Sequence, residues 1–317
     1  MLVIAEYIVV ASLVVWLSVK ASRYIDMLDK TTKLSGAFLG GVLLSAITSL
    51  PELFTSISAV VLLRKPSLCI GNILGSNLFN IAMLAFLGIV AIRGFRHARV
   101  SRGNRMVTLF VLLVYVALIL NWFNLLNFEI ATINIVTLVI VALYGFGVRY
   151  LAGENGEKCA DEGSKVSLTV RQIVVRFTAA SIGIVVLSVL MTYITDDLAT
   201  QYNIGMGMAG AIFLGVATSL PEVSSTVALL RMRCYDIAVG NIVGSNLFNF
   251  LVLCIADVLC VRQSVYDFSD GNVVNLLVFG TVATIAALPA LRSQRLGVRV
   301  VCLAATVACY VAFLLAS

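Results

Sequence analysis

Residues 71–80 read GNILGSNLFN and residues 240–249 read GNIVGSNLFN, so only one position differs between two stretches far apart in the chain. A shorter pair lies upstream, because TSLPE occupies both 48–52 and 218–222. The two copies are offset by 170 residues for the upstream pair and by 169 for the downstream pair. Internal repetition of this kind indicates two copies of one structural unit.

The composition excludes an ordinary soluble domain. Of the 317 residues, 61% are hydrophobic and only 12% are charged, whereas soluble domains carry about a quarter charged residues. A helix needs roughly 20 apolar residues to cross the hydrocarbon core of a bilayer. Ten stretches of suitable length are expected to span: 3–19, 34–63, 68–92, 106–126, 130–150, 173–194, 204–230, 235–261, 272–291 and 298–316.

The motif copies divide these expected spans into two halves of five. Residues 1–152 form the first half with motif region 36–80, residues 153–172 form a short linker, and residues 173–317 form the second half with motif region 206–249. An odd number of crossings turns the second half over relative to the first. The expected fold is therefore an all-α polytopic membrane protein of ten transmembrane helices, in two inverted five-helix repeats with helices broken near the midplane.

The positive charges predict the orientation in the membrane. Of the 22 Lys and Arg residues, 19 fall in one set of alternate loops. Because cytoplasmic loops are enriched in Lys and Arg, both termini are expected outside and the central loop in the cytoplasm, in the plasma (cell inner) membrane. The net charge of +6 then reflects orientation, not nucleic-acid binding. The partner expected from the sequence is the lipid bilayer, and no obligate protein partner is inferred.

Polar residues recur on single helix faces in both copies. Spacings of three and four residues place side chains on one face of a helix. Carboxylate, hydroxyl, amide and carbonyl oxygens are hard donors that suit Na⁺ and Ca²⁺. The faces comprise Ser45, Thr48, Ser49 and Glu52; Gly215, Thr218, Ser219 and Glu222; Asn72, Ser76 and Asn80; and Asn241, Ser245 and Asn249.

A proline precedes the glutamate in each copy. Pro51 and Pro221 lack a backbone N–H and push away the carbonyl four residues earlier, which frees carbonyls near Thr48 and Thr218 as additional ligands. A carboxylate within the membrane costs several kcal/mol and usually marks an ion path. Two facing carboxylates carry the charge that one Ca²⁺ balances. Such a site requires a bound cation or protons, which favours obligatory exchange over leak.

The doubled TSLPE and GNxxGSNxFN motifs closely resemble the two alpha-repeats of the sodium/calcium exchanger family, within the calcium/cation antiporter superfamily. The resemblance covers nearly the whole chain. It implies a secondary active antiporter that exchanges Na⁺ for Ca²⁺ by alternating access, with the first and sixth spans sliding across the other eight. The transported ions are the bound species, and no cofactor is implied.

The resemblance also implies roles for residues at matching positions. The carboxylates of Glu52 and Glu222, with the carbonyls of Thr48 and Thr218, would bind Ca²⁺. Ser49 and Ser245 would join Glu52 in one Na⁺ site, and Ser219 and Ser76 would join Glu222 in its counterpart. The remaining implied ligands are the carbonyls of Ser45 and Gly215, with Asn80 and Asn249 flanking the centre.

Two positions and one loop depart from the family pattern. Ile47 replaces a usual Gly, and Asn249 replaces the Asp of potassium-dependent members, which argues against K⁺ co-transport. The linker is too short for the calcium-sensing domains of animal exchangers. The principal alternative is Ca²⁺/H⁺ antiport with Glu52 and Glu222 carrying protons, but proton-coupled relatives have Glu where this chain has GSN. A channel would require a continuous pore, and no motif typical of an enzyme is present.

Two further expectations concern packing and charge. Gly71, Gly75, Gly240 and Gly244 have the GxxxG spacing that permits close helix approach, here of the third and eighth spans to the second and seventh. Asp257 is expected at the outer end of the eighth span, either hydrated or paired with Arg262, with a role in attracting cations as the alternative.

Overall fold

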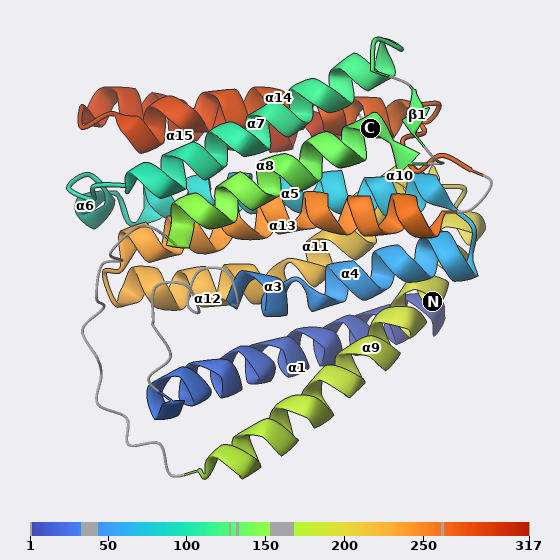
Figure 1. Cartoon of the computed structure of the whole chain (residues 1–317), viewed down its shortest axis with the longest axis horizontal. Helices are drawn as coiled ribbons and strands as arrows, with labels where there is room; N and C mark the ends of the chain where they lie inside the picture. Colours follow the sequence, from blue (N-terminus) through green and yellow to red (C-terminus); the bar gives the residue numbers. More distant parts are fainter. Residues whose placement is uncertain are drawn as a thin grey trace.

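The computed structural model describes residues 2–32, 44–126, 128–130, 133–152, 168–260 and 263–316. Apart from one short hairpin, the regular structure in these ranges is helical (Figure 1). The elements are α1 (Leu2–Thr32), α3 (Leu44–Thr48), α4 (Leu50–Ile57), the π-helical η2 (Ser58–Leu62), α5 (Pro66–Val90), α6 (Ile92–Phe95), α7 (Arg102–Trp122), β1 (Glu129–Ile130), β2 (Ile133–Asn134), α8 (Ile135–Ala152), α9 (Val170–Gln201), α10 (Met206–Ala209), the π-helical η3 (Gly210–Gly215), α11 (Val216–Thr218), α12 (Leu220–Arg231), α13 (Tyr235–Leu259), α14 (Gly271–Arg292) and α15 (Leu296–Ala316).

The helices confirm a multi-pass membrane protein. In the described part of the chain, seven helices are long and apolar enough to cross a bilayer, namely α1, α5, α7, α9, α13, α14 and α15. A bent helix pair, Met206–Thr218 with Leu220–Arg231, raises this number to eight. Shorter apolar helices at Leu50–Leu62 and Ile135–Leu151 occupy the places of the second and fifth expected spans. Residues 33–43, which begin the second expected span, lie outside the described residues.

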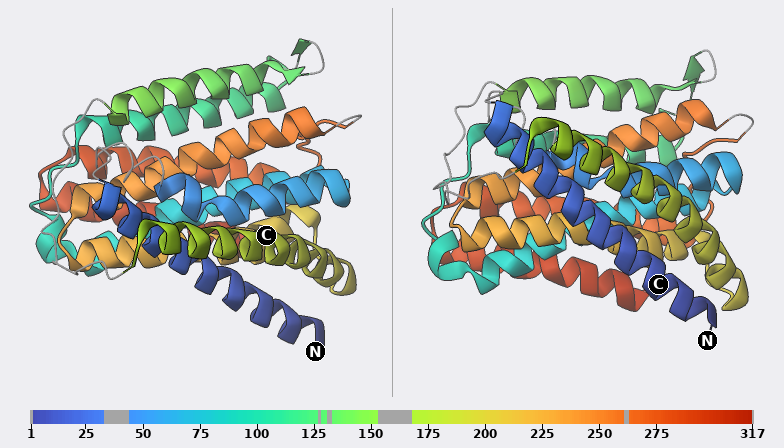
Figure 2. Two further views of the ribbon diagram at one scale, coloured as in Figure 1. Left: turned by 60° about the horizontal axis from the view of Figure 1, so that its bottom comes forward. Right: turned by 90° about the horizontal axis from the view of Figure 1, so that it is seen from below.

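The helices lie in a main bundle with one separate pair beside it (Figure 1). α5 and α13 lie centrally in the bundle, and α7, α8, α14 and α15 cover one side of them. α1 and α9 pack mainly against each other along the opposite side, and both views of Figure 2 show them crossing obliquely. This pair therefore lies at the edge of the molecule, apart from the central helices.

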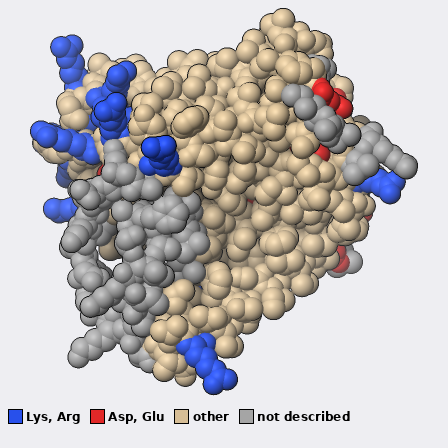
Figure 3. All heavy atoms as spheres, in the orientation of Figure 1, with Lys and Arg blue, Asp and Glu red and all other residues tan. Residues whose placement is uncertain are grey.

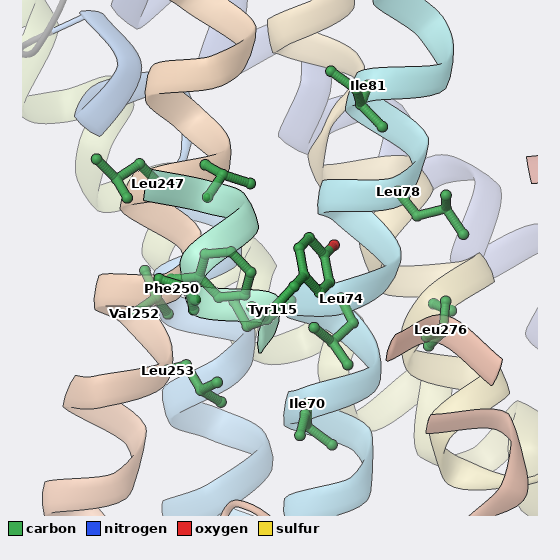
Figure 4. Packing of buried hydrophobic residues seen from close by; sticks show 14 of the residues in the cluster. Ile70, Leu74, Leu78, Ile81, Tyr115, Leu247, Phe250, Val252, Leu253 and Leu276 are labelled. Atoms are coloured by element: carbon green, nitrogen blue, oxygen red, sulfur yellow. The ribbon is translucent and has the colours of Figure 1, made fainter. Parts of the chain in front are cut away.

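Large apolar side chains fill the space between the central helices (Figure 4). Ile70, Leu74 and Leu78 on α5 are fully buried. Tyr115 of α7 packs edge-on against Phe250 of α13, with ring centroids 5.2 Å apart. In a bilayer, apolar side chains gain little by leaving the lipid, because lipid tails are equally apolar. The helices are therefore held together by van der Waals contact between closely packed side chains. The polar motif residues are thus held in a rigid apolar frame.

Both motif helices break where the prolines predict. α3 ends at Thr48 and α4 begins at Leu50, with Ser49 between them at φ −89° and ψ 13°. In the second copy, α11 and α12 meet at Ser219, where the helix axis bends by 41°. Pro at the start of a helix is well tolerated because the first N–H groups have no intrahelical acceptor. Each break therefore exposes backbone directly before a glutamate.

Glycines of the first GN motif bring α5 against the second motif region. A Cβ at Gly71 would lie 2.3 Å from the carbonyl oxygen of Gly207, and one at Gly75 would lie 2.4 Å from Cα of Ala211. Only glycine allows backbones to approach this closely. The glycines of the third span thus permit close approach, as expected, but to the seventh span of the other half and not to the second, and Gly240 faces the side chain of Asn104.

Two helix starts differ from the expected span boundaries. A span was expected from residue 130, but β1 and β2 pair there and α8 begins at Ile135. The Asn134 side chain accepts a hydrogen bond from the Val136 N–H at 3.0 Å, which caps the helix. α9 begins at Val170 inside the expected linker, because Thr169 and Gln172 form a capping box. Residues 153–167 of the linker lie outside the described residues.

Basic side chains gather at one end of the helices (Figure 3), the end from which α7 begins and at which α14 finishes. Both termini lie at the other end (Figure 1). Arg299 differs from the other basic residues because it is buried, with 1% of its surface exposed. Its guanidinium donates to the carbonyls of Phe95, Ala98 and Ala290, and so fixes the turn after α6 against α14 and α15.

Candidate functional site

Two glutamates lie buried at corresponding places in the two motif copies. Glu52 lies in the first turn of α4, Glu222 lies in the first turn of α12, and neither has any exposed surface. A carboxylate at a helix N-terminus faces the positive end of the helix dipole, which offsets part of the cost of burying its charge. The helix breaks at Ser49 and Ser219 thus place each negative charge where the backbone can stabilise it.

Serine hydroxyls connect these carboxylates across the two halves. Ser49 donates to Oε1 of Glu222 at 3.0 Å, and Ser219 donates to Oε1 of Glu52 at 3.2 Å. The family resemblance grouped each serine with the glutamate of its own half, but in the structure each hydroxyl bonds to the opposite one. The two predicted faces therefore meet at one place, and each half completes the other's carboxylate environment.

Several acceptor oxygens around the glutamates remain unsatisfied. The second carboxylate oxygen, Oε2, of each glutamate accepts no hydrogen bond from the described residues. Buried polar atoms are nearly always paired in proteins, and these two ionisable oxygens are open to a cation or a proton. Nine neutral oxygens of the described residues are also unpaired: in α5 and α13 the amide oxygens of Asn72, Asn80, Asn241 and Asn249 and the Ser245 hydroxyl, and in α1 and α9 the hydroxyls of Ser18, Ser181, Ser188 and Thr195.

Two of these asparagines also fasten the GN helices to the broken helices. The Asn72 amide nitrogen donates to the hydroxyls of Thr55 and Ser56 at 3.0 and 2.9 Å. In the second copy, the Asn241 amide nitrogen donates to the hydroxyls of Ser225 and Thr226 at 2.9 and 3.1 Å. These equivalent bonds orient each amide so that its oxygen is left unpaired.

A reciprocal asparagine network joins α5 to α13 and was missed in the sequence. Asn77 and Asn246 each donate to the other's backbone carbonyl, at 3.2 and 3.0 Å. Their amide oxygens accept from the expected site residues, Asn80 donating to Asn246 at 3.1 Å and Asn249 to Asn77 at 2.9 Å. The available signal was that Asn77 and Asn246 occupy matching positions in the repeat, although they lie off the face that carries the other polar residues.

The remaining predicted residues join the same region. The Ser76 hydroxyl donates to the Gly215 carbonyl at 3.2 Å, and the Ser45 hydroxyl lies 3.4 Å from the Asn241 carbonyl. Thr48 and Thr218 are fully buried, and their hydroxyls donate to carbonyls three and four residues earlier in the chain, those of Ser45 and Leu214. The structure thus brings residues from both motif copies together, as the repeat predicted.

Asp257 lies near the end of α13, as expected, but its surroundings differ from the expected ones. Only 7% of its surface is exposed, so it is not a hydrated boundary residue. Its Oδ2 accepts from the backbone N–H of Asn134 at 3.2 Å and from the Thr137 hydroxyl at 2.7 Å. Arg262, its suggested partner, lies outside the described residues. Asp257 therefore fastens the start of α8 to α13, away from the glutamate pair.

The donor set at the glutamates suits hard cations. Among the described residues, no group of three or more His, Cys, Asp or Glu side chains is placed to hold a metal ion. The site instead combines two carboxylates with neutral amide, hydroxyl and carbonyl oxygens. Such oxygens favour alkali and alkaline-earth cations over transition metals.

Comparisons with known proteins show related sequences and solved structures of the same fold. Inner membrane protein YrbG of Escherichia coli (strain K12) is 29% identical over 242 residues, which cover 72% of this chain and 70% of YrbG. The sodium-calcium exchanger NCX_Mj, soaked with 100 mM Na⁺ and 10 mM Sr²⁺, is 18% identical with a TM-score of 0.64, over 100% of this chain and 99% of that chain. The H⁺/Ca²⁺ exchanger CAX is 17% identical with a TM-score of 0.68, over 98% and 88%.

The family model described as "Sodium/calcium exchanger protein" matches residues 4–152 and 173–317, which includes both motif copies and both broken helices. These segments contain the paired glutamates, the crossed serines and the central asparagines. The chain therefore belongs to the sodium/calcium exchanger protein family.

Proposed function

We propose that this protein is a secondary active antiporter that exchanges Na⁺ for Ca²⁺ across the membrane by alternating access. The observation that carries the proposal is the pair of buried glutamates, each with one oxygen held by a serine of the other half and one oxygen unpaired. One Ca²⁺ between Glu52 and Glu222 would balance both charges. The twelve residues expected from the sequence remain the proposed ligands and their supports.

The neutral oxygens favour Na⁺ over H⁺ as the exchanged ion. Protons would neutralise the two carboxylates, but they would leave the amide oxygens of Asn80 and Asn249 and the Ser245 hydroxyl without a partner. Na⁺ ions would satisfy both the carboxylates and these neutral acceptors. Since several Na⁺ would replace one Ca²⁺, transport is expected to move net charge.

The proposed architecture is two inverted five-helix repeats, with both termini outside and the central loop in the cytoplasm. The equivalent hydrogen bonds made by the two copies support the relation between the halves. The gathering of Lys and Arg at the end opposite the termini supports the orientation.

We assign the moving part to α1 and α9. Side-chain contacts join this pair to the bundle: the Tyr7 hydroxyl donates to the Phe213 carbonyl at 2.6 Å, the Thr192 hydroxyl reaches the Thr55 carbonyl at 3.4 Å, and Lys65 pairs with Asp196. None of these three contacts involves the central asparagine network, so the pair can move without disrupting that network. Movement of this kind would open the site to one side at a time.

Ca²⁺/H⁺ antiport is the alternative that a specific observation supports. The structure resembles the H⁺/Ca²⁺ exchanger CAX as well as NCX_Mj, with TM-scores of 0.68 and 0.64. The fold is thus common to both kinds of exchanger, and the choice between them depends on the neutral oxygens around the glutamates.

Transport in reconstituted liposomes tests the proposal. Uptake of radioactive Ca²⁺ is measured with an outward Na⁺ gradient and, separately, with an outward H⁺ gradient. We expect uptake with Na⁺ alone, lost in both Glu52→Gln and Glu222→Gln. Asp257→Asn is the matched control, because it also neutralises a buried carboxylate but lies in another network.

The outcomes distinguish the site from the coupling ion. Uptake driven by H⁺ alone, and lost in the same two variants, would support the alternative and retain the site. Uptake that persists in either glutamate variant would refute the assigned site. If folded Asp257→Asn also lost uptake, the loss in the glutamate variants would no longer show that Glu52 and Glu222 form the transport site.

A further inference from the structure

A hollow of about 810 Å³ opens between α7 and α14, remote from the glutamate pair. It lies at the end of the molecule where Lys and Arg gather (Figure 3). Arg102 and Arg105 come from the first turn of α7, and Arg292 is the last residue of α14. The apolar part of the wall is formed by Met106, Leu109 and Leu288.

The three arginines bring positive charge together without a matching acid. None of them forms an ion pair with a carboxylate in the described ranges. The Arg105 Nε donates to the Ser101 carbonyl at 3.2 Å. Asp236, in the first turn of α13, accepts from the Ser101 N–H and the Asn104 amide, each at 2.8 Å, so its carboxylate is engaged at the start of α7 and not with the arginines. An anion in the hollow would therefore meet three guanidinium groups that no carboxylate of the described residues pairs.

Exposed apolar stripes continue from the hollow along both helices. On α7, Leu113 and Val116 extend the spacing of Arg102, Met106 and Leu109, and both are 41% exposed. Because these positions recur every three or four residues, they form one face of the helix. That face begins with a charge at the end of the helix and continues with apolar side chains toward the middle of the membrane.

The stripe on α14 has the same order. Arg292 and Pro289 lie at its end, and Ile285, Val282 and Val278 follow at helical spacing, with 51%, 47% and 41% of their surfaces exposed. A soluble anion would make use of the arginines alone. A lipid would fill the hollow with its headgroup and lay its acyl chains along both stripes, which makes it the better match.

We propose that this hollow binds the phosphate headgroup of an anionic phospholipid from the leaflet at the basic end of the molecule. Guanidinium groups bind phosphate oxygens through paired hydrogen bonds. Basic pockets between membrane helices are suited to anionic headgroups. A bound lipid would link the beginning of α7 to the end of α14 and so stabilise that end of the bundle. This inference concerns binding alone and does not depend on the coupling ion.

Native mass spectrometry of the purified full chain tests the proposal, with dioleoyl phosphatidylglycerol and dioleoyl phosphatidylcholine as probes. Each basic residue near an anionic lipid surface contributes about fivefold in affinity. We expect the triple variant Arg102→Gln, Arg105→Gln, Arg292→Gln to bind phosphatidylglycerol about 100-fold more weakly. The matched control is Arg149→Gln, Arg171→Gln, Arg176→Gln, which removes the same charge from three exposed positions outside the hollow. Because these three arginines do not line the hollow, the control should lose clearly less affinity than the triple variant.

Two further arms separate the possible ligands. Inorganic phosphate at millimolar concentration should not displace the lipid, and Leu109→Thr should weaken the binding of phosphatidylglycerol. Displacement by phosphate alone would overturn the lipid assignment in favour of a soluble anion. Two results would refute the assignment of the hollow as the binding site. One is equal phosphatidylglycerol affinity in the triple variant and its control, and the other is equal binding of phosphatidylglycerol and phosphatidylcholine to the wild type. Arg292→Gln alone, at the exposed end of α14, repeats the test with a single change and an expected fivefold loss.

Discussion

Replacing Asn77 by Ala tests whether the central asparagine network holds the proposed ion-binding oxygens in place. The change removes the acceptor of the Asn249 amide, which now donates to Asn77 at 2.9 Å. It also removes a donor to the Asn246 carbonyl, but that carbonyl lies within α13, where it can keep its helical bond. The principal loss is therefore the anchor of Asn249, whose own oxygen is one of the unpaired acceptors.

The expected size follows from that single anchor. An unsatisfied buried donor costs about 1–3 kcal/mol, while hydrogen bonds within membrane proteins average about 0.6 kcal/mol. We expect Asn77→Ala to cost about 2 kcal/mol in total, as the sum of a lower free energy of unfolding and weaker ion binding. A share of about 1.4 kcal/mol in binding corresponds to tenfold weaker Ca²⁺ affinity. The equivalent change Asn246→Ala should have a similar effect because it releases Asn80.

Equilibrium binding of radioactive Ca²⁺ to the purified protein, without Na⁺, measures the affinity, and thermal unfolding measures the stability. Asn121→Ala is the matched control: its amide donates to the Leu126 carbonyl at 3.3 Å and to Asn134 at 3.0 Å, outside the site. It should lower the unfolding temperature and leave the affinity unchanged. Wild-type Ca²⁺ affinity in Asn77→Ala, or an equal loss in the control, would refute the reasoning.

Three other predictions follow from contacts described above. Ser49→Ala and Ser219→Ala each remove a donor to a carboxylate, so each should raise the Na⁺ concentration for half-maximal transport about tenfold, to similar extents, in liposome assays. Gly75→Ala forces a methyl group into backbone and should cost about 1–3 kcal/mol in thermal unfolding, whereas Gly145→Ala, with open space around it, should not destabilise. Arg299→Met should cost about 3 kcal/mol of stability and leave Ca²⁺ affinity unaltered; a change in affinity would contradict a purely structural role.

The repeat allowed much of the fold and the composition of the site to be predicted. Hydropathy located the helices, and the prolines located the breaks at Ser49 and Ser219, because both depend on local sequence. The glutamates were expected together because each occupies the same place in its copy. The predicted start of the fifth span was wrong, because the pairing of β1 with β2 depends on backbone contacts that hydropathy does not report.

Contacts between the halves could not be predicted in the same way. The partner of each serine depends on how two broken helices cross, which spacing along one helix does not determine. Asn77 lies on a neighbouring face of α5 from Asn72, Ser76 and Asn80, so a search for one polar face passed over it. Asp257 has the sequence surroundings of a boundary residue, and its partner Thr137 lies 120 positions away.

The crossed serine contacts limit how the two copies can diverge. Because Ser49 serves the carboxylate of the second copy and Ser219 that of the first, a substitution in either copy changes the surroundings of a charge in the other. One half alone would bury a glutamate in lipid without its donor. The two copies are therefore constrained as a single unit, and the identity of TSLPE at 48–52 and 218–222 within one chain is the expected result of that dependence.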